Sequence, residues 1–175
     1  MTSPATLNVP LSSEAVRRWY DSVGSGIERA ERYESRAKAA AIRLLVVTPG
    51  ARVLNVGVGA GQKQRRLQDC AGAHGVTIGL DVSPGMLAYA RQRVAAAFCR
   101  ADIRALPFPD CSFDFIFSAC VLDLLPTEDL LATLGELRSP NTACRASMCW
   151  CTMRLLATMV LSERKTSTMC VNWST

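Results

Sequence analysis

Three glycines at alternate positions, Gly57, Gly59 and Gly61, are the residues of this 175-residue chain whose spacing first suggests binding chemistry. They lie in the segment NVGVGAGQ, between an apolar stretch and a helix-like stretch. Glycine has no side chain, so such a loop bends sharply and brings backbone N–H groups close to a ligand. The loop alone leaves three interpretations open: dinucleotide phosphates, a nucleoside with an amino-acid tail, or a tight turn without a ligand.

Two familiar nucleotide-binding loops do not fit this spacing. The dinucleotide pattern is G-x-G-x-x-G, but its sixth position is Gln62 counted from Gly57 and Gln64 counted from Gly59. The P-loop pattern needs G-K followed by Ser or Thr, which is absent here. The observed pattern, G-x-G-x-G, therefore argues against NAD, FAD and a P-loop nucleotide.

Strands and helices are expected to alternate from residue 51 to residue 138, after two helices near the N-terminus. Apolar runs predict buried strands at 52–57, 76–82, 97–102 and 113–119. Helical spacing and capping residues predict helices at 12–20, 30–47, 60–72, 83–96 and 127–138.

This order predicts the α/β class, with a Rossmann-like, doubly wound and mostly parallel sheet. In such sheets the ligand crevice lies at the carboxyl ends of the strands. We expect three parts: a helical segment at 1–50, a ligand-binding core at 51–138 and an atypical tail at 139–175.

The tail differs in composition from the core. It contains four of the eight cysteines and none of the eleven glycines. We expect the sheet to be incomplete after its fourth strand, unless residues 146–153 supply one substitute strand. The abrupt change near residue 139 suggests a frameshift, an alternative splice or a gene-model junction.

The net charge and the spacing of the cysteines limit the kinds of partner that the sequence predicts. The formal net charge of +5 comes with no long basic run, so no nucleic-acid partner is predicted. No cysteine pair has C-x-x-C spacing and His74 is the single histidine, so no metal site is predicted. The apolar stretches are shorter than the roughly 18 residues of a membrane span, and no secretory signal is evident. We expect a cytoplasmic protein, with organelle targeting as the open alternative.

Four ordered motifs resemble one known family. They are VLNVGVGAG at 53–61, GLDVSPGMLAYAR at 79–91, CRADIRALPFPDCSFDFIF at 99–117 and VLDLLP at 121–126. Together they resemble a class I S-adenosylmethionine-dependent methyltransferase, of the branch similar to ubiquinone/menaquinone-biosynthesis methyltransferases. The resemblance implies S-adenosylmethionine (AdoMet) as cofactor and a small-molecule methyl acceptor as partner.

The resemblance also implies roles at the glycine loop and the second strand. The three glycines would lie under the methionine part of the cofactor, with Gly61 closing the loop. Asp81 would accept hydrogen bonds from both ribose hydroxyls, a task that suits a carboxylate. The alternative for Asp81 is an ordinary helix or turn cap.

The remaining implied contacts surround the adenine ring and close the site. Val82 and Met86 would pack beside adenine, although core packing alone would also explain Met86. Asp102 would accept from the adenine amino group, with a turn or capping role as its alternative, and Ile103 would flank the ring. Ser118 would close the site after the fourth strand. Tyr20 or Tyr33 would cap the cofactor or the substrate.

One implied contact departs from the family. The residue that ends the first strand is usually acidic and helps to hold the cofactor's ammonium group, but here it is Asn55. An amide accepts a hydrogen bond without offering charge.

No catalytic residue is identifiable. The sequence therefore predicts an AdoMet-dependent methyltransferase, with two alternatives: a truncated, catalytically inactive AdoMet-binding protein, and a nucleotide-dependent oxidoreductase that the glycine spacing disfavours.

Overall fold

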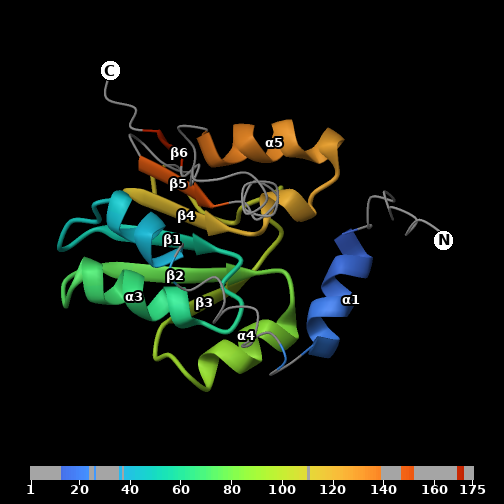
Figure 1. The fold of residues 1–175 in the computed structure, drawn as a ribbon, viewed down its shortest axis with the longest axis horizontal. Coiled ribbons are helices and arrows are strands. Elements are labelled where there is room, and N and C mark those ends of the chain that lie inside the picture. Colours follow the sequence, from blue (N-terminus) through green and yellow to red (C-terminus); the bar gives the residue numbers. More distant parts are fainter. Residues whose placement is uncertain are drawn as a thin grey trace, which may run out of the picture.

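Within the described residues, six strands form one sheet in the order β3-β2-β1-β4-β5-β6 (Figure 1). The structure, a computed structural model, describes residues 13–23, 26, 36, 38–109, 111–138, 147–151 and 169–171. The strands are β1 (Arg52–Val56), β2 (Val76–Asp81), β3 (Ala97–Arg100), β4 (Phe115–Ala119), β5 (Ser147–Cys151) and β6 (Met169–Val171). The helices are α1 (Ser13–Val23), α3 (Gln62–Ala71), α4 (Pro84–Arg91) and α5 (Thr127–Arg138), with a 3₁₀ turn, η2, at Leu122–Leu124.

The strand order reverses direction at β1. Strands β3, β2, β1, β4 and β5 pair in parallel, and β6 pairs antiparallel with β5. In the register, Val56 lies beside Leu80 of β2 and beside Ser118 of β4. The carboxyl ends of the central strands are therefore level with one another, and β1 with β4 forms the switch point where such sheets bind ligands.

Both faces of the sheet are covered by apolar packing. Val53 packs in one buried cluster with Leu67 of α3 and Leu45, which follows the helical residues 38–44. Its neighbour in sequence, Leu54, packs on the opposite face in a cluster that includes Leu137 of α5. Successive side chains of a strand point to opposite faces, so β1 contributes to both clusters. The prediction of a doubly wound, mostly parallel Rossmann-like sheet is confirmed.

The start of α4 shows how local sequence sets an element. The side chain of Ser83 accepts a 3.0 Å hydrogen bond from the backbone N–H of Met86, and Pro84 is the first residue of the helix. Proline suits this position because the first N–H groups of a helix have no partner within it. This cap fixes where α4 begins, directly after the end of β2.

The sheet continues beyond the strand predicted to be its last. Strand β5 pairs with β4, with Phe115 beside Ser147 and Ala119 beside Cys151. Residues 147–151 therefore fill the expected gap next to β4. They lie within residues 146–153, the segment that the sequence analysis named as a possible substitute strand. The other residues from 139 to 175 lie outside the described part of the chain, apart from β6. The predicted helix at 30–47 is described at residues 36 and 38–44, which are helical.

Candidate functional site

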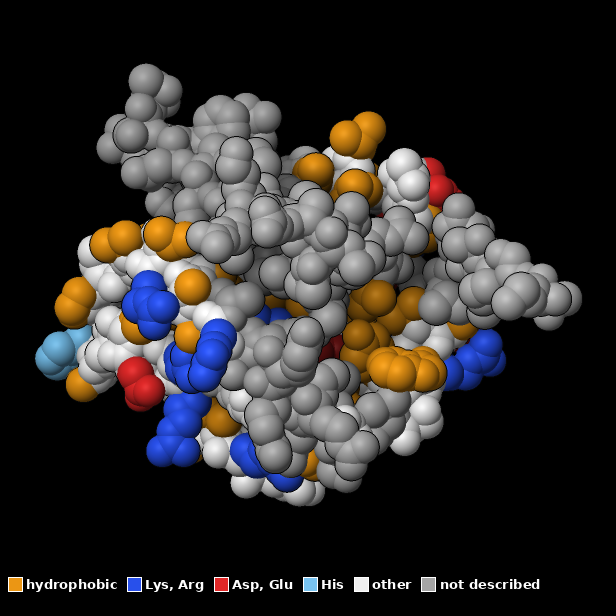
Figure 2. Space-filling view, in the orientation of Figure 1, with side chains coloured by type: hydrophobic (Ala, Val, Ile, Leu, Met, Phe, Trp, Pro, Cys, Tyr) orange, Lys and Arg blue, Asp and Glu red, His pale blue; other side chains and the backbone are white. Residues whose placement is uncertain are grey.

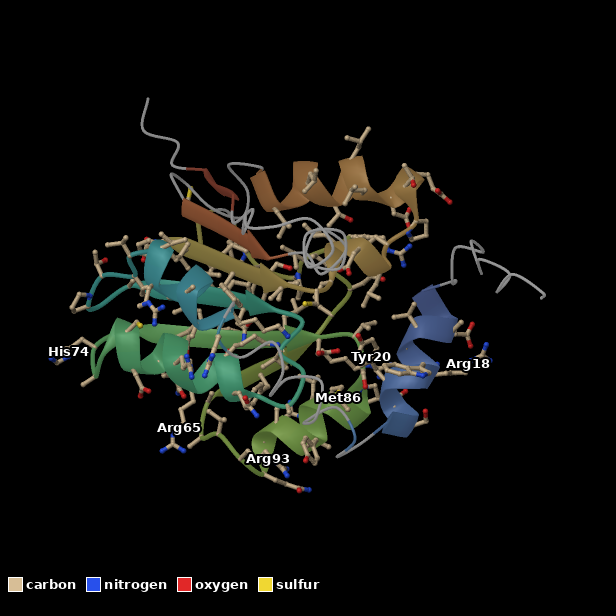
Figure 3. The ribbon with its side chains drawn as sticks, viewed as in Figure 1. Arg18, Tyr20, Arg65, His74, Met86 and Arg93 are labelled. Atoms are coloured by element: carbon tan, nitrogen blue, oxygen red, sulfur yellow. The ribbon has the colours of Figure 1, made fainter. Side chains whose placement is uncertain are left out.

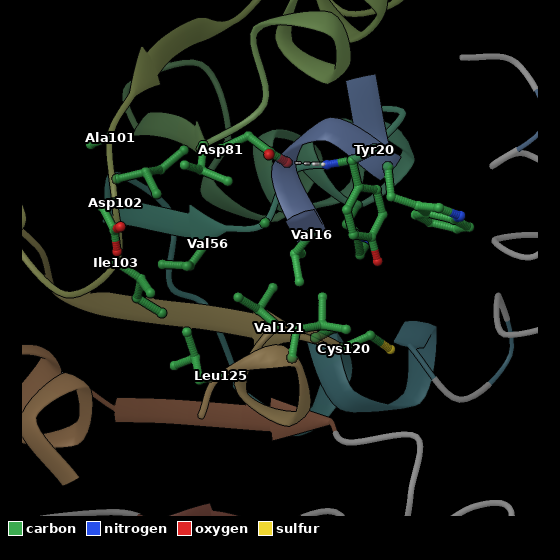
Figure 4. A pocket seen from close by; sticks show the side chains of 18 of the residues that line it. Val16, Tyr20, Val56, Asp81, Ala101, Asp102, Ile103, Cys120, Val121 and Leu125 are labelled. Carbon is green, nitrogen blue, oxygen red and sulfur yellow. Dashed lines mark hydrogen bonds between the residues drawn. The ribbon is translucent and has the colours of Figure 1, made fainter. Parts of the chain in front are cut away.

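A pocket of about 320 Å³ lies at the carboxyl ends of β1, β2, β3 and β4 (Figure 4). Its walls are mainly apolar and include Val56, Leu80, Ile103 and Val121. Helix α1 supplies a further wall, although it is far from these strands in the sequence. The pocket therefore forms where the strand-end rule places a ligand.

The glycine loop forms part of the lining of this pocket. The N–H of Gly57 donates to the carbonyl of Leu80 at 2.8 Å, which ties the loop to the end of β2. Gly57 has a φ of +71°, and a Cβ there would lie 2.1 Å from Cγ2 of Val121. A side chain at this position would therefore collide with the loop after β4. Gly57 and Gly59 both line the pocket.

Asp81 supplies a buried carboxylate to the pocket wall. One oxygen, Oδ2, accepts from the backbone N–H of Gly59 at 3.1 Å, and Oδ1 accepts from that of Ser83 at 3.0 Å. Burial raises the pKa of Asp81 above its usual value, while these hydrogen bonds and the charge of Lys63 act in the opposite direction. A carboxylate oxygen can accept more than one hydrogen bond, so Asp81 retains acceptor capacity toward the pocket.

Asp102 lines the pocket from the loop after β3, and Arg104 fixes its carboxylate. The Arg104 guanidinium donates to Oδ1 at 3.0 Å and to Oδ2 at 2.7 Å, and it also donates to Asp129 of α5 at 2.7 Å. The hydrogen bond from Arg104 is the main reason that the pKa of Asp102 is below its usual value. The pair therefore connects the pocket wall to the start of α5.

Helix α1 brings Val16, Trp19 and Tyr20 to the pocket. The rings of Trp19 and Tyr20 meet edge to face, with centroids 4.9 Å apart, and Trp19 is still 55% exposed. Burial, together with the charges of Asp123 and Asp81, raises the pKa of Tyr20 to about 12. Tyr20 is therefore a neutral phenol at physiological pH, able to donate and accept hydrogen bonds. Tyr33, its alternative in the sequence, lies outside the described residues.

Two lysines line the same pocket, and neither is among the residues predicted from the sequence. Lys63 is the second residue of α3, and Lys38 belongs to the helical residues 38–44. Each is only 6% exposed. The position of Lys63 directly after the glycine loop was a usable signal, because the start of this helix must face the strand ends. Lys38 carried no comparable signal, since nothing local predicts where its helix packs.

The structure brings six of the ten predicted site residues to the pocket. These are Gly57, Gly59, Asp81, Val82, Asp102 and Ile103.

The other four predicted residues are buried and are not among those that line the pocket. Asn55 is fully buried, and its amide nitrogen donates to Oε1 of Gln64 at 3.0 Å. Gly61 precedes α3 with a φ of +89°. Met86, labelled in Figure 3, is buried in α4, and Ser118 is buried one residue before the end of β4. His74 lies in an exposed turn far from this site, as Figure 3 also shows.

Neither a metal cluster nor a spanning helix is found in the part of the chain that the structure describes. No group of three or more metal-ligating side chains occurs among those residues. Likewise, none of their helices combines the length and the apolarity needed to cross a bilayer.

In the space-filling view, Lys and Arg side chains gather over α3, where Arg65 and Arg66 are exposed (Figure 2).

This fold and site define a Rossmann-like protein with a mainly apolar pocket at the switch point and an acidic side chain at the end of β2. Residues 53–140 match the family model described as a methyltransferase domain. The chain belongs to this family, which confirms the resemblance to class I methyltransferases.

Relatives with assigned activities are methyltransferases. The demethylmenaquinone methyltransferase of Bacillus licheniformis is 32% identical over 128 residues, which cover 71% of this chain and 53% of that protein. The malonyl-[acyl-carrier protein] O-methyltransferase of Serratia marcescens is 40% identical over 91 residues, which cover 51% of this chain and 33% of that enzyme. This chain therefore spans about half the length of the first relative and a third of the second.

A solved structure gives the same result for the fold. The crystal structure of a SAM-dependent methyltransferase from Aquifex aeolicus superimposes with a TM-score of 0.57 at 26% identity. The match covers 65% of this chain and 62% of that one.

Proposed function

We propose that this chain binds S-adenosylmethionine in the strand-end pocket and transfers its methyl group to a small-molecule acceptor. The observation that carries the proposal is the buried carboxylate of Asp81, held by Gly59 and Ser83 at the wall of a mainly apolar pocket. Family membership and the SAM-dependent relative support the same cofactor.

The residues present fit a nucleoside of this kind. Asp81 offers acceptors for a ribose diol, and Val82 and Ile103 supply apolar surface for a flat base. Asp102 stands beside Ile103, with its carboxylate oriented by Arg104. Gly57 and Gly59 line the pocket where the cofactor's tail would lie, and neither carries a side chain. Asn55, Gly61, Met86 and Ser118 would support these contacts from behind.

Methyl transfer from AdoMet depends little on any individual side chain. When bound, AdoMet supplies an electrophilic methyl group on a sulfonium, a reaction in which positioning and exclusion of water lower the barrier. The walls formed by Val16, Val121 and Leu125 would exclude water. With a pKa of about 12, Tyr20 would orient an acceptor by hydrogen bonding rather than remove its proton.

The acceptor class rests on the relatives and on the apolar walls. The named relatives act on demethylmenaquinone and on malonyl-[acyl-carrier protein], by their names. An acceptor that presents an apolar body would match Trp19 and Leu124 at the pocket. We therefore propose a small, largely apolar methyl acceptor.

Titration calorimetry tests the cofactor assignment. AdoMet is titrated into the full chain and into Asp81→Ala, with circular dichroism confirming that both are folded. We expect binding to the unchanged chain and a loss of about 10- to 100-fold in affinity for the variant, because charge-assisted hydrogen bonds are removed. No binding by the folded, unchanged chain would reject the proposal. Binding without transfer to any acceptor would favour the inactive AdoMet-binding alternative.

A further inference from the structure

Asp102 uses most of its hydrogen-bonding capacity on Arg104, two residues further along the chain. Its Oδ1 accepts from the backbone N–H of Arg104 and from Nε of the same residue, both at 3.0 Å, and its Oδ2 accepts from Nη2 at 2.7 Å. A carboxylate has about four acceptor positions. Arg104 therefore fills all but one of them, and the open position is on Oδ2 of a residue that lines the pocket beside Ile103 (Figure 4).

A second acid holds Arg104 in this orientation. Nη1 of Arg104 donates to Oδ2 of Asp129 at 2.7 Å, and Asp129 lies in the first turn of α5. An acid in that turn is stabilised by the positive end of the helix. Because the donors of a guanidinium are fixed in one plane, the contact with Asp129 also limits how the Asp102 carboxylate can turn.

The same pairing determines the charge of Asp102. The hydrogen bond from the Arg104 side chain is the main reason that the pKa of Asp102 is below its usual value. Asp81, which also lines the pocket, is affected in the opposite direction, because burial raises its pKa. A carboxyl that stays ionised has no proton to donate. Asp102 therefore offers the pocket one acceptor and no donor.

One fixed acceptor without a donor distinguishes between flat bases. The amino group of adenine is a donor and fits the open position on Oδ2. A carbonyl in place of that amino group, as in hypoxanthine, would bring a second acceptor against an ionised carboxylate. A site that hydrogen-bonds a ligand group rejects the analogue that lacks it, because the polar group of the site is then left unpaired.

We infer that Arg104 is a positioning residue that sets the base selectivity of this pocket: held by Asp129, it leaves Asp102 a single, oriented acceptor that selects a base with an amino group over one with a carbonyl. The inference rests on the proposed function. Arg104 is not among the residues that line the pocket, so it acts through Asp102 rather than by touching the ligand.

A second arginine–aspartate pair has nearly the same geometry away from the pocket. Asp114 accepts from the backbone N–H and Nε of Arg52 through Oδ2, at 2.8 and 3.2 Å, and from Nη2 through Oδ1 at 2.8 Å. Arg52 is the first residue of β1, at the opposite end of the strand from the pocket, and neither residue lines the pocket. This pair provides a matched control for the loss of such a contact.

Two ligands that differ at one position of the base test the inference on the unchanged protein. Calorimetry compares S-adenosylhomocysteine with S-inosylhomocysteine, in which a carbonyl replaces the amino group and N1 gains a hydrogen. We expect S-adenosylhomocysteine to bind about 10- to 100-fold more tightly, the effect of a hydrogen bond to a charged group. Equal affinity for the two ligands would overturn the inference, and this comparison needs no variant to fold.

Variants then assign the selectivity to Arg104. Arg104→Gln is expected to reduce the preference about tenfold, chiefly by weakening S-adenosylhomocysteine, because Asp102 is no longer held in place. Arg52→Gln should leave the preference unchanged. A full preference in Arg104→Gln, an equal weakening of both ligands in that variant, or the same loss of preference in Arg52→Gln would overturn the inference.

A milder variant decides the matter if circular dichroism shows that Arg104→Gln is unfolded. Asp129→Asn keeps Arg104 and removes only the charge of its outer partner, so the preference should fall by about two- to fivefold, the effect of one partly exposed ion pair. An unchanged preference in Asp129→Asn would then overturn the inference.

The outcomes separate this inference from the proposed function. If the unchanged chain binds S-adenosylhomocysteine and S-inosylhomocysteine equally well, the cofactor pocket stands and the role of Arg104 fails. If the folded chain binds AdoMet and neither analogue, the cofactor assignment likewise stands and the selectivity assigned to Arg104 fails. If it binds none of the three, both fail.

Discussion

The Asp21 carboxylate of α1 accepts a 2.6 Å hydrogen bond from the hydroxyl of Ser83, the residue that caps α4. The same oxygen accepts from the backbone N–H of Gly85 at 3.1 Å. Ser83 in turn donates its backbone N–H to Asp81. One buried serine thus connects the helix that covers the pocket with the acid that we propose for the ribose.

Removing this connection should loosen α1. We expect Asp21→Ala to lower the free energy of unfolding by about 1–2 kcal/mol, because its hydrogen bonds from Ser83 and Gly85 and its ion pair with Arg17 are lost. Glu14→Ala is the control on the same helix, since its contacts are ion pairs of 3.8–3.9 Å with Arg17 and Arg18, and its cost should stay within about 0.5 kcal/mol. Urea unfolding measures both, and equal effects would contradict the role of Asp21.

The contribution of Asp21 should also depend on pH. Burial acts to raise the pKa of Asp21, but hydrogen bonds from Ser83 and Gly85 and the charge of Arg17 together hold it below its usual 3.8. A lowered pKa in the folded state means that this stabilisation is complete above the unfolded value and is lost as the pH falls through the folded one. The difference between the native chain and Asp21→Ala should therefore shrink below about pH 4.

A steric prediction concerns Gly57. An alanine there needs an unfavourable φ of +71° and also meets Cγ2 of Val121 at 2.1 Å. Gly72 has nearly the same φ, +70°, with nothing within 4 Å of the added Cβ. With a ψ of −173°, Gly72 lies in a backbone region that is essentially confined to glycine, so we expect Gly72→Ala to cost about 1–3 kcal/mol, the backbone penalty alone. Gly57→Ala should cost about 2–4 kcal/mol, since crowding adds to that penalty.

A second substitution that removes the contact with Val121 tests the prediction for Gly57→Ala. Adding Val121→Ala to Gly57→Ala removes the methyl group that collides, so the combined variant should recover part of the loss. Thermal or urea unfolding of the unchanged chain, the two single variants and the combined variant gives the coupling between the two positions. Additive effects of Gly57→Ala and Val121→Ala would show that the close approach has no energetic consequence.

Cofactor binding should weaken in acid because of Asp81. Burial raises the pKa of this carboxyl above its usual 3.8, and the ribose diol is bound best by the ionised form. AdoMet affinity should therefore be constant at neutral pH and fall as the pH drops through the raised pKa of Asp81. Asp81→Asn should bind more weakly throughout and lose this pH dependence. Calorimetry from pH 8 to pH 4 measures both profiles, and parallel profiles would contradict the assignment.

The sequence predicted the elements that depend on local pattern. Four apolar runs predicted β1 to β4, although β3 has no buried residue, and Ser83 followed by Pro84 predicted the start of α4. The placement of Asp81 at the pocket followed from one rule, that parallel strands end at the same edge. These features depend on residues that are close together in the chain.

Features that depend on packing between distant segments were not predictable. Lys38 reaches the pocket from a helix that precedes β1, and nothing in its neighbourhood encodes that docking. The face to which Asn55 points was equally hidden, because β1 is apolar on both sides and shows no alternation. The sequence did not predict which strand would pair with the outer side of β4, since residues 147–151 lack a strand pattern bounded by turns.

The last prediction concerns the buried chain of side-chain hydrogen bonds that begins at Asn55. Its amide donates to Gln64, which donates to Thr77 at 3.0 Å, all without exposure to the pocket. Asn55→Asp would place a carboxylate in this buried site, so we expect a loss of about 2–4 kcal/mol at pH 8. The loss should diminish toward pH 4, because burial raises the pKa of the new acid and protonation removes its charge.

The control for Asn55 is the same amide-to-acid change on the surface. Gln62→Glu, exposed in the first turn of α3, should change stability by no more than about 0.5 kcal/mol and in the favourable direction, since an acid suits a helix N-terminus. Because Asn55 does not line the pocket, Asn55→Asp should leave AdoMet affinity unchanged. A gain of about tenfold or more would instead show that an acid at this position reaches the cofactor's ammonium group.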